Sequence, residues 1–236
     1  GGFPAVRHNY IRWSSLEGKR QRRRTAARVQ RTLAGDPQSP DARAHGAIDL
    51  MTNAREIFVS VDVETSGPIP GEYSLLSIGA CSAFDPDNGF TVEVKPINDK
   101  FDAKALEVTG LSMKDLSQRG LAPAAAMKTF SDWLATLADP GETLVFLGFN
   151  APFDWSFVNY YFHRFAGENP FGFTALDIKA LYMGVTGCSW RDTRSSKMAE
   201  ILKPTLLGTH DALQDARYQA EFFRLLWGRI SADQQD

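Results

Sequence analysis

Alternating apolar and polar residues predict the first strand of the chain. Between residues 57 and 65, Ile and Val at odd positions alternate with even positions that end in Asp62 and Glu64. Successive side chains of a strand point to opposite faces, so these two carboxylates lie side by side on one face. Such a pair repels itself unless a cation is close, and Mg²⁺ or Mn²⁺ prefers oxygen ligands. The pattern therefore indicates either a metal site or a solvent-facing acidic edge strand.

The same reasoning predicts the other elements of an α/β domain. A turn at 85–89 joins two of the strands in a hairpin, so three antiparallel strands place Asp62 and Glu64 on a central sheet. A continuous apolar run at 143–149 predicts a fully buried strand. The pattern predicts strands over 57–65, 73–84, 90–94, 143–149 and 173–176. It predicts helices over about 103–108, 124–138, 152–164 and 209–228, and a further helix that begins at residue 178.

Composition is that of an ordinary globular protein, but charge is unevenly spread. The chain has 236 residues, 43% of them hydrophobic. Residues 1–50 hold ten Lys/Arg and four Asp/Glu, whereas residues 51–236 hold sixteen and twenty-four. A basic arm thus precedes an acidic body.

The basic arm, residues 1–50, shows little apolar periodicity. It fits a nucleic-acid-binding arm, an Arg-rich targeting segment, or an extension or linker outside the working domain. Met51 stands just ahead of the first strand. We interpret residues 1–50 as an extension or linker and residues 51–236 as the domain.

Cysteine use and hydropathy limit the protein class. Cys81 and Cys188 are far apart, which favours neither a disulfide framework nor a thiolate zinc site. A reducing compartment, the cytoplasm, is therefore expected. No apolar run approaches the roughly 20 residues that span a bilayer, so no membrane partner is expected.

Further polar residues stand at the ends of predicted elements. Asp154 falls in the first turn of a helix that follows a buried strand, with Asn150 or Ala151 at the cap, and a carboxylate there also simply matches the helix dipole. In the last helix, with Thr209 as the expected N-cap, Asp215 lies roughly 140° round from His210. Asp215 can point at the sheet while His210 approaches from the side, although a single surface histidine is the plainer interpretation.

Together these residues resemble a known family. Asp62-x-Glu64-Thr65, Asn150-x-x-Phe153-Asp154 and His210-x-x-x-x-Asp215 occur in the order found in the DEDDh, DnaQ-like 3′-to-5′ exonucleases. The stretches 75–80 and 108–111 share the pattern, and the resemblance covers about residues 56–228. It implies a ribonuclease H-like α/β fold of three layers, with a central mixed five-stranded sheet flanked by helices. Phe149 departs from the pattern, since many relatives carry His there.

The resemblance also implies a mechanism for phosphodiester hydrolysis. Two Mg²⁺ or Mn²⁺ ions, about 3.5–4 Å apart, stabilise the entering and leaving oxygens. By analogy Asp62 bridges both ions, Glu64 and Asp215 complete the first, and Asp154 supports the second directly or through water. His210 is implied to be the general base that accepts the proton of the attacking water.

The implied partner is single-stranded nucleic acid with a free 3′ end. Candidates for binding the terminal nucleotide are Thr65, Leu75, Leu76, Asn150 and Phe153, although Leu75, Leu76 and Phe153 fit a core role equally well. Residues 169–177 resemble ribonuclease T, which favours RNA slightly. The alternative function is that of a proofreading or scaffold subunit in a polymerase or processing complex, and a homodimer is also left open.

Overall fold

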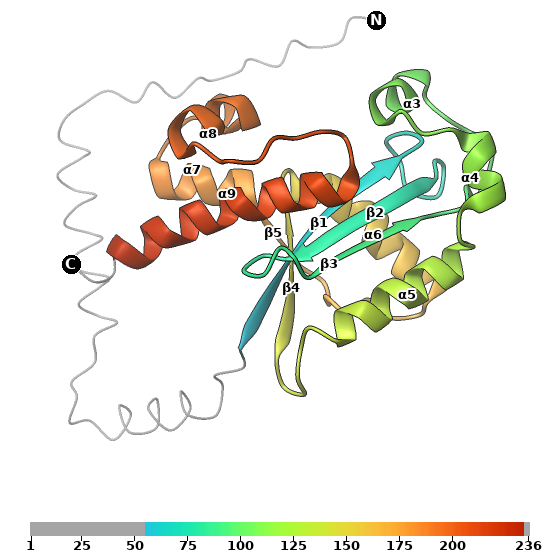
Figure 1. Cartoon of the computed structure of the whole chain (residues 1–236), viewed down its shortest axis with the longest axis horizontal. Coiled ribbons are helices and arrows are strands. Elements are labelled where there is room, and N and C mark those ends of the chain that lie inside the picture. The colour runs from blue at the N-terminus through green and yellow to red at the C-terminus, as the bar shows by residue number, and fades with distance from the viewer. Residues whose placement is uncertain (1–54, 234–236) are drawn as a thin grey trace, which may run out of the picture. The chain divides into compact units, whose positions relative to one another are not determined.

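Five strands form one mixed sheet with β1 (Glu56–Thr65) at its centre, in the computed structural model, which describes residues 55–233 (Figure 1). The strand order is β3-β2-β1-β4-β5. β1 pairs antiparallel with β2 (Leu75–Ser82), which pairs antiparallel with β3 (Gly89–Glu93), and parallel with β4 (Thr143–Gly148), which pairs parallel with β5 (Ala175–Asp177). The predicted strands and the mixed five-stranded sheet are confirmed. The predictions for residues 1–50 and for Met51 lie outside the described residues.

Helices cover both faces of this sheet. The helices among residues 55–233 are α3 (Ala103–Thr109), α4 (Met113–Arg119), α5 (Pro123–Ala135), α6 (Ala151–Phe165), α7 (Ile178–Thr186), α8 (Ser195–Leu202) and α9 (Ala212–Asp233), with a 3₁₀ turn, η1, at Trp190–Thr193. Of these, α5 and α6 pack on one face of the sheet and α7, α8 and α9 on the other. The sequence pattern did not predict α4, η1 or α8. Within residues 55–233, no helix combines the length and the apolar character needed to cross a bilayer.

The two faces of β1 belong to two hydrophobic cores. Val59, Val61 and Val63 pack with α5 and α6, including Phe130 and Phe157. Phe58, on the opposite face, instead packs with buried residues of α7, α8 and α9. The predicted alternation is therefore confirmed, and it produces three layers. Because Asp62 and Glu64 share the parity of Phe58, they lie on the face covered by α9.

A glycine of β2 lets α9 approach the sheet directly beside Asp62. Gly79 is the cross-strand partner of Asp62 in the antiparallel register. A Cβ atom at Gly79 would lie only 2.0 Å from the carbonyl carbon of Ala212 and 2.1 Å from the backbone nitrogen of Leu213. The first turn of α9 therefore rests on the backbone of β2, which brings Asp215 over β1.

The start of α9 differs from the prediction. Asp211, rather than Thr209, caps the helix, because its Oδ1 accepts a hydrogen bond from the backbone N–H of Gln214 at 3.0 Å. His210 precedes the helix with a left-handed φ of 59°. Ala216, Ala220 and Phe223 of α9 are buried in the core that also holds Phe58.

Candidate active site

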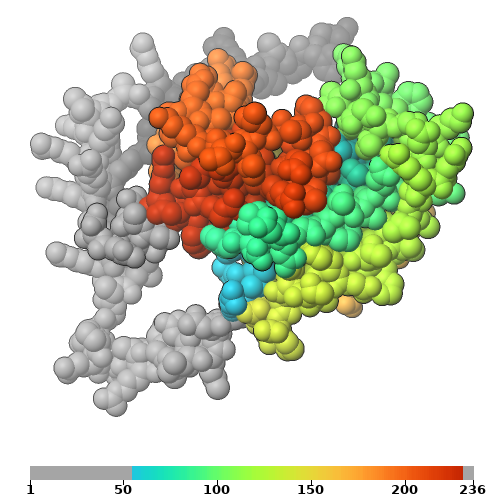
Figure 2. All heavy atoms as spheres, viewed as in Figure 1, coloured from blue at the N-terminus to red at the C-terminus, as the bar shows by residue number. Residues whose placement is uncertain are grey.

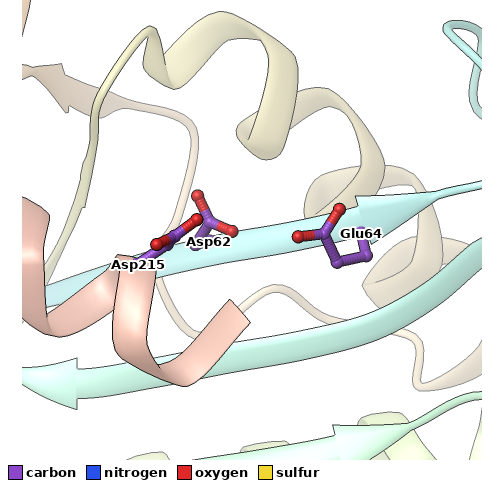
Figure 3. Close-up of side chains that lie close together, drawn as sticks. All are labelled: Asp62, Glu64 and Asp215. Atoms are coloured by element: carbon purple, nitrogen blue, oxygen red, sulfur yellow. The ribbon is translucent and has the colours of Figure 1, made fainter. Parts of the chain in front are cut away.

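Three carboxylates converge where the first turns of α9 cross β1. One carboxylate oxygen each from Asp62, Glu64 and Asp215 lies within 4.8 Å of the other two. Figure 3 shows Asp62 and Glu64 on one strand, with Asp215 reaching them from the helix. None of the ion pairs among residues 55–233 involves these three side chains. Only oxygen donors meet here, which is the donor set that a hard divalent cation prefers.

Asp154 accepts a hydrogen bond from the backbone of β1 beside this cluster. The pairing of β1 with β4 ends at Ser60 and Leu147, which leaves the following part of β1 without a strand on that side. There the backbone N–H of Val63 donates a hydrogen bond to Asp154 Oδ1, at 3.1 Å. Asp154 is buried and its carboxylate is held between the positions of Asp62 and Glu64 on the strand.

The turn that positions Asp154 depends on a residue that sequence analysis did not single out. Asn150 occupies the N-cap position of α6, but its φ is left-handed at 68° and its side chain makes no capping hydrogen bond. Asp177 supplies that function instead, because its Oδ2 accepts from the Ala151 N–H at 2.7 Å. Its Oδ1 accepts from the Ala180 N–H at the start of α7, also at 2.7 Å.

Gln219 is a second residue of the site that sequence analysis missed. Its side chain is 5% exposed, its Nε2 donates to Asp62 Oδ1 at 2.5 Å, and its Oε1 accepts from the Phe149 N–H at 3.0 Å. The available signal was its spacing, because Gln219 follows Asp215 by four residues and so lies on the same side of α9.

His210 is placed by the same carboxylate that faces β1. Asp215 accepts hydrogen bonds from the backbone N–H groups of Thr209, at 2.7 Å, and His210, at 3.0 Å. These bonds hold the turn before α9 against the site. The exposed His210 side chain lines a cavity of about 540 Å³ together with Asp62 and Asp215.

The surroundings of Asp62, Glu64 and Asp154 raise the pKa values of these three carboxyl groups and so favour their neutral forms. Burial first, and then the charges of Asp154, Glu64 and Asp215, raises the pKa of Asp62 well above its usual range, against the opposing bond from Gln219. Burial and the charges of Asp215 and Asp154 raise the pKa of Glu64 to about 8. Burial also raises the pKa of Asp154 to about 7, although the hydrogen bond from Val63 opposes the shift. A bound cation would remove this penalty on the charged forms.

A second cavity adjoins Glu64 and collects part of the predicted substrate-binding set. It measures about 390 Å³, and its lining includes Glu64, Thr65, Phe153 and the exposed Val108 at the end of α3. Asn150 lines neither this cavity nor the one beside His210. Leu75 and Leu76, which were also candidates, are fully buried and expose no surface to a substrate in this structure.

A three-layer fold with this acidic centre defines the class of protein. The family model of the ribonuclease T-type exonucleases matches residues 59–223, and the chain belongs to this exonuclease family. The recognised DEDDh resemblance is thereby confirmed, and the protein is a 3′–5′ exonuclease. Members of this family use divalent metal ions, and the cluster of Asp62, Glu64 and Asp215 is suited to hold them.

Individual relatives agree with the family assignment. The 3′–5′ DNA exonuclease Cap18 of Escherichia coli is 59% identical over 176 residues, which cover 75% of this chain and 94% of that protein. The nuclease domain of 3′hExo, a DEDDh family member bound to rAMP, is 18% identical, with a TM-score of 0.62 over 75% of this chain and 94% of that one. Escherichia coli exonuclease I in complex with a dT13 oligonucleotide is 17% identical, with a TM-score of 0.57 over 75% of this chain and 43% of that one. The two structures share the fold.

Proposed function

We propose that this chain removes nucleotides from the 3′ end of single-stranded DNA by metal-dependent hydrolysis. The observation that carries the proposal is the convergence of oxygens from Asp62, Glu64 and Asp215 within 4.8 Å. DNA replaces the slight preference for RNA drawn from the sequence, because the relative with 59% identity is a DNA exonuclease.

The carboxylates are proposed to hold two Mg²⁺ or Mn²⁺ ions. Oxygens of Asp62, Glu64 and Asp215 are close enough to ligate one ion together, and Asp154 supports them through its hydrogen bond from Val63 on the strand that carries Asp62 and Glu64. Such ions, when bound, stabilise the entering and leaving oxygens of an in-line displacement at phosphorus. The raised pKa values of Asp62, Glu64 and Asp154 support this role, because buried carboxyl groups at neutral pH need a positive partner to ionise.

His210 is proposed as the general base. Its side chain is exposed to the cavity that also contains Asp62 and Asp215, so a water molecule in that cavity can reach the imidazole. A neutral ring nitrogen accepts the proton of the attacking water, and the hydrogen bonds from the backbone N–H groups of Thr209 and His210 to Asp215 hold the turn that carries the ring beside the site.

The terminal nucleotide is proposed to occupy the cavity beside Glu64. Phe153 and Val108 offer apolar surface for a base, and Thr65 lies at its edge close to Glu64. Asn150 is proposed to act through the turn that carries Phe153 and Asp154, because it sits at the N-cap position of their helix.

The test is end-trimming of matched single strands. DNA and RNA oligomers of one sequence, labelled at the 5′ end, are incubated with the full chain and Mg²⁺ or Mn²⁺, and with EDTA as control. We expect stepwise shortening that EDTA stops, with DNA cut faster than RNA. Asp62→Asn should abolish it, whereas Asp132→Asn, exposed on α5 and paired with Lys128, should not.

Each other result has a defined meaning. Faster trimming of RNA would overturn the DNA assignment but not the enzyme class. Undiminished shortening in EDTA would contradict the metal mechanism. No shortening of either strand, with the fold intact, would favour a subunit that works only within a larger complex.

A chain that lacks residues 1–50 should trim at the rate of the full chain, because the family match begins at residue 59.

A further inference from the structure

The cavity beside His210 extends away from the carboxylates towards α8. Its lining includes Phe149 and Tyr218, and it reaches Ser195, Ser196 and Ala199 of α8. In Figure 2 the α7–α8 region (orange) stands at the surface next to α9 (red). A polymer whose 3′ end lies at the carboxylates therefore has an open route along this side of the molecule.

An aromatic side chain and a lysine continue this route. Lys179 Nζ lies 5.9 Å from the ring centroid of Phe149 and 4.4 Å from that of Trp190. Phe149 belongs to the cavity wall, whereas Trp190 in η1 is 54% exposed. Lys179 thus connects the cavity to an aromatic ring that is presented to solvent, close to a positive charge.

The same segment reverses the charge of the domain. Residues 178–203 hold five basic residues and two acidic ones, while the rest of residues 51–236 holds eleven basic and twenty-two acidic residues. Arg191 and Arg194 are exposed, and neither takes part in an ion pair among residues 55–233. A polyanion approaching this acidic domain is therefore attracted here and repelled by the net charge of the rest of residues 51–236.

We infer that Lys179, Trp190, Arg191 and Arg194, named here the α7–α8 surface, bind the single strand on the 5′ side of the nucleotide being removed. Exposed rings on which bases stack, combined with cations along the backbone, are the means by which proteins hold single strands without reading sequence. The inference rests on the proposed function, since it assigns the path of that same substrate. Stacking and phosphate contacts do not depend on the sugar, so this surface should hold DNA and RNA alike.

The experiment measures equilibrium binding in EDTA, where no cleavage competes. Fluorescence anisotropy is followed for the full chain with labelled single strands of two and twelve nucleotides over a range of salt. Trp190→Ala should weaken binding of the twelve-mer at least about fivefold, the lower end of what one stacked base contributes. The double variant Arg191→Ala/Arg194→Ala should make the slope of log K against log salt shallower by about 0.7 for each phosphate that the protein no longer neutralises. Binding of the dinucleotide should not change in either variant.

Matched controls separate this surface from general effects of charge and exposure. Phe173→Ala removes an aromatic ring that is 90% exposed, and Lys114→Ala/Lys128→Ala removes two cations from α4 and α5. Both should bind the twelve-mer like wild type. With metal present, Trp190→Ala should raise KM for the twelve-mer and leave kcat unchanged. The altered side chains are exposed, so circular dichroism should report the wild-type fold for all variants.

The outcomes distinguish this inference from the function on which it rests. Wild-type cleavage with normal binding and KM in the α7–α8 variants would overturn the surface alone. Length-dependent binding that needs the surface, without cleavage in metal, would overturn the proposed function and keep the surface. No measurable binding of the twelve-mer by wild type at low salt would also overturn the surface.

Discussion

Gln219 hydrogen-bonds Asp62 directly, with 2.5 Å between Nε2 and Oδ1, and also accepts a bond from the Phe149 N–H. Gln219 lies one turn after Asp215 on α9, while Phe149 lies between β4 and the helix that carries Asp154. One side chain therefore joins the three segments that supply the carboxylates. Because Gln219 orients an oxygen of Asp62, replacing Gln219 should lower the catalytic rate more than it lowers the stability of the fold.

Gln219→Leu should lower kcat about tenfold or more. A hydrogen bond to a charged group contributes about 1.5–3 kcal/mol, and each 1.4 kcal/mol is about tenfold in rate. KM should change little, and the metal concentration for half-maximal rate should rise, because Asp62 is no longer held. Gln214→Leu, exposed on the same helix, is the control. Wild-type kcat in a folded Gln219→Leu protein would contradict a positioning role.

His210→Ala should reduce the rate roughly 10²–10⁴-fold, the usual contribution of a general base. The carboxylates are unchanged, so metal should still raise the melting temperature of the variant. His163→Ala, exposed near the end of α6, should retain the wild-type rate. The pH–rate profile decides the role, since a variant that keeps the wild-type profile would assign the base to another group.

Gly79→Ala should displace α9 and remove activity. The added methyl group would lie about 2 Å from backbone atoms of Ala212 and Leu213, which cannot rotate away as a side chain can. Overpacking of this kind costs about 1–3 kcal/mol and sometimes more, which a thermal melt would show. Gly184→Ala in α7 has no neighbour within 4 Å and should stabilise the helix by up to about 1 kcal/mol. Equal activity of the two variants would contradict the close approach of α9.

Without metal, stability should fall as pH rises from about 5 to 8. The pKa of Glu64 is raised from 4.5 to about 8 and that of Asp154 from 3.8 to about 7. At a pH between the ordinary pKa of each group and its raised pKa in the fold, the folded protein binds more protons than the unfolded chain. A rise in pH through this range therefore favours unfolding. The melting temperature in EDTA should therefore be lower at pH 8 than at pH 5.5, and Glu64→Gln should flatten the difference. Added Mg²⁺ should stabilise more at pH 8, and a melting temperature that rises with pH in EDTA would contradict the raised pKa values.

The sequence predicted those parts of the fold that follow from local periodicity. Alternation in 57–65 identified the central strand and the common face of Asp62 and Glu64, because a strand has no other way to place residues two apart. Two short elements were not predicted, because α8 buries only Met198 and Leu202 and η1 buries only Thr193. Two buried residues in one or two turns form no periodic pattern.

The residues of the site could be predicted where they matched a spaced motif. They could not be predicted where only tertiary contacts bring two residues together. Asp177 caps α6 from 26 positions away along the chain, and Gln219 meets Asp62 across 157, so no local rule indicates either pair. Thr209 and Asp211 are both good capping residues. Asp211 caps because Asp215 already takes the N–H groups of Thr209 and His210, which ends the preceding turn there.

The position of α9 as the last element of the sheet domain bears on when the enzyme becomes active. The chain is synthesised from its N-terminus, so β1 leaves the ribosome with Asp62 and Glu64 long before Asp215 and Gln219 follow. During that interval the growing chain lacks the proposed metal ligand Asp215, the amide of Gln219 and the proposed base His210 at once. On the proposed mechanism, synthesis therefore delays the nuclease, and cutting of nearby nucleic acid begins only after α9 has been made and has packed on the sheet.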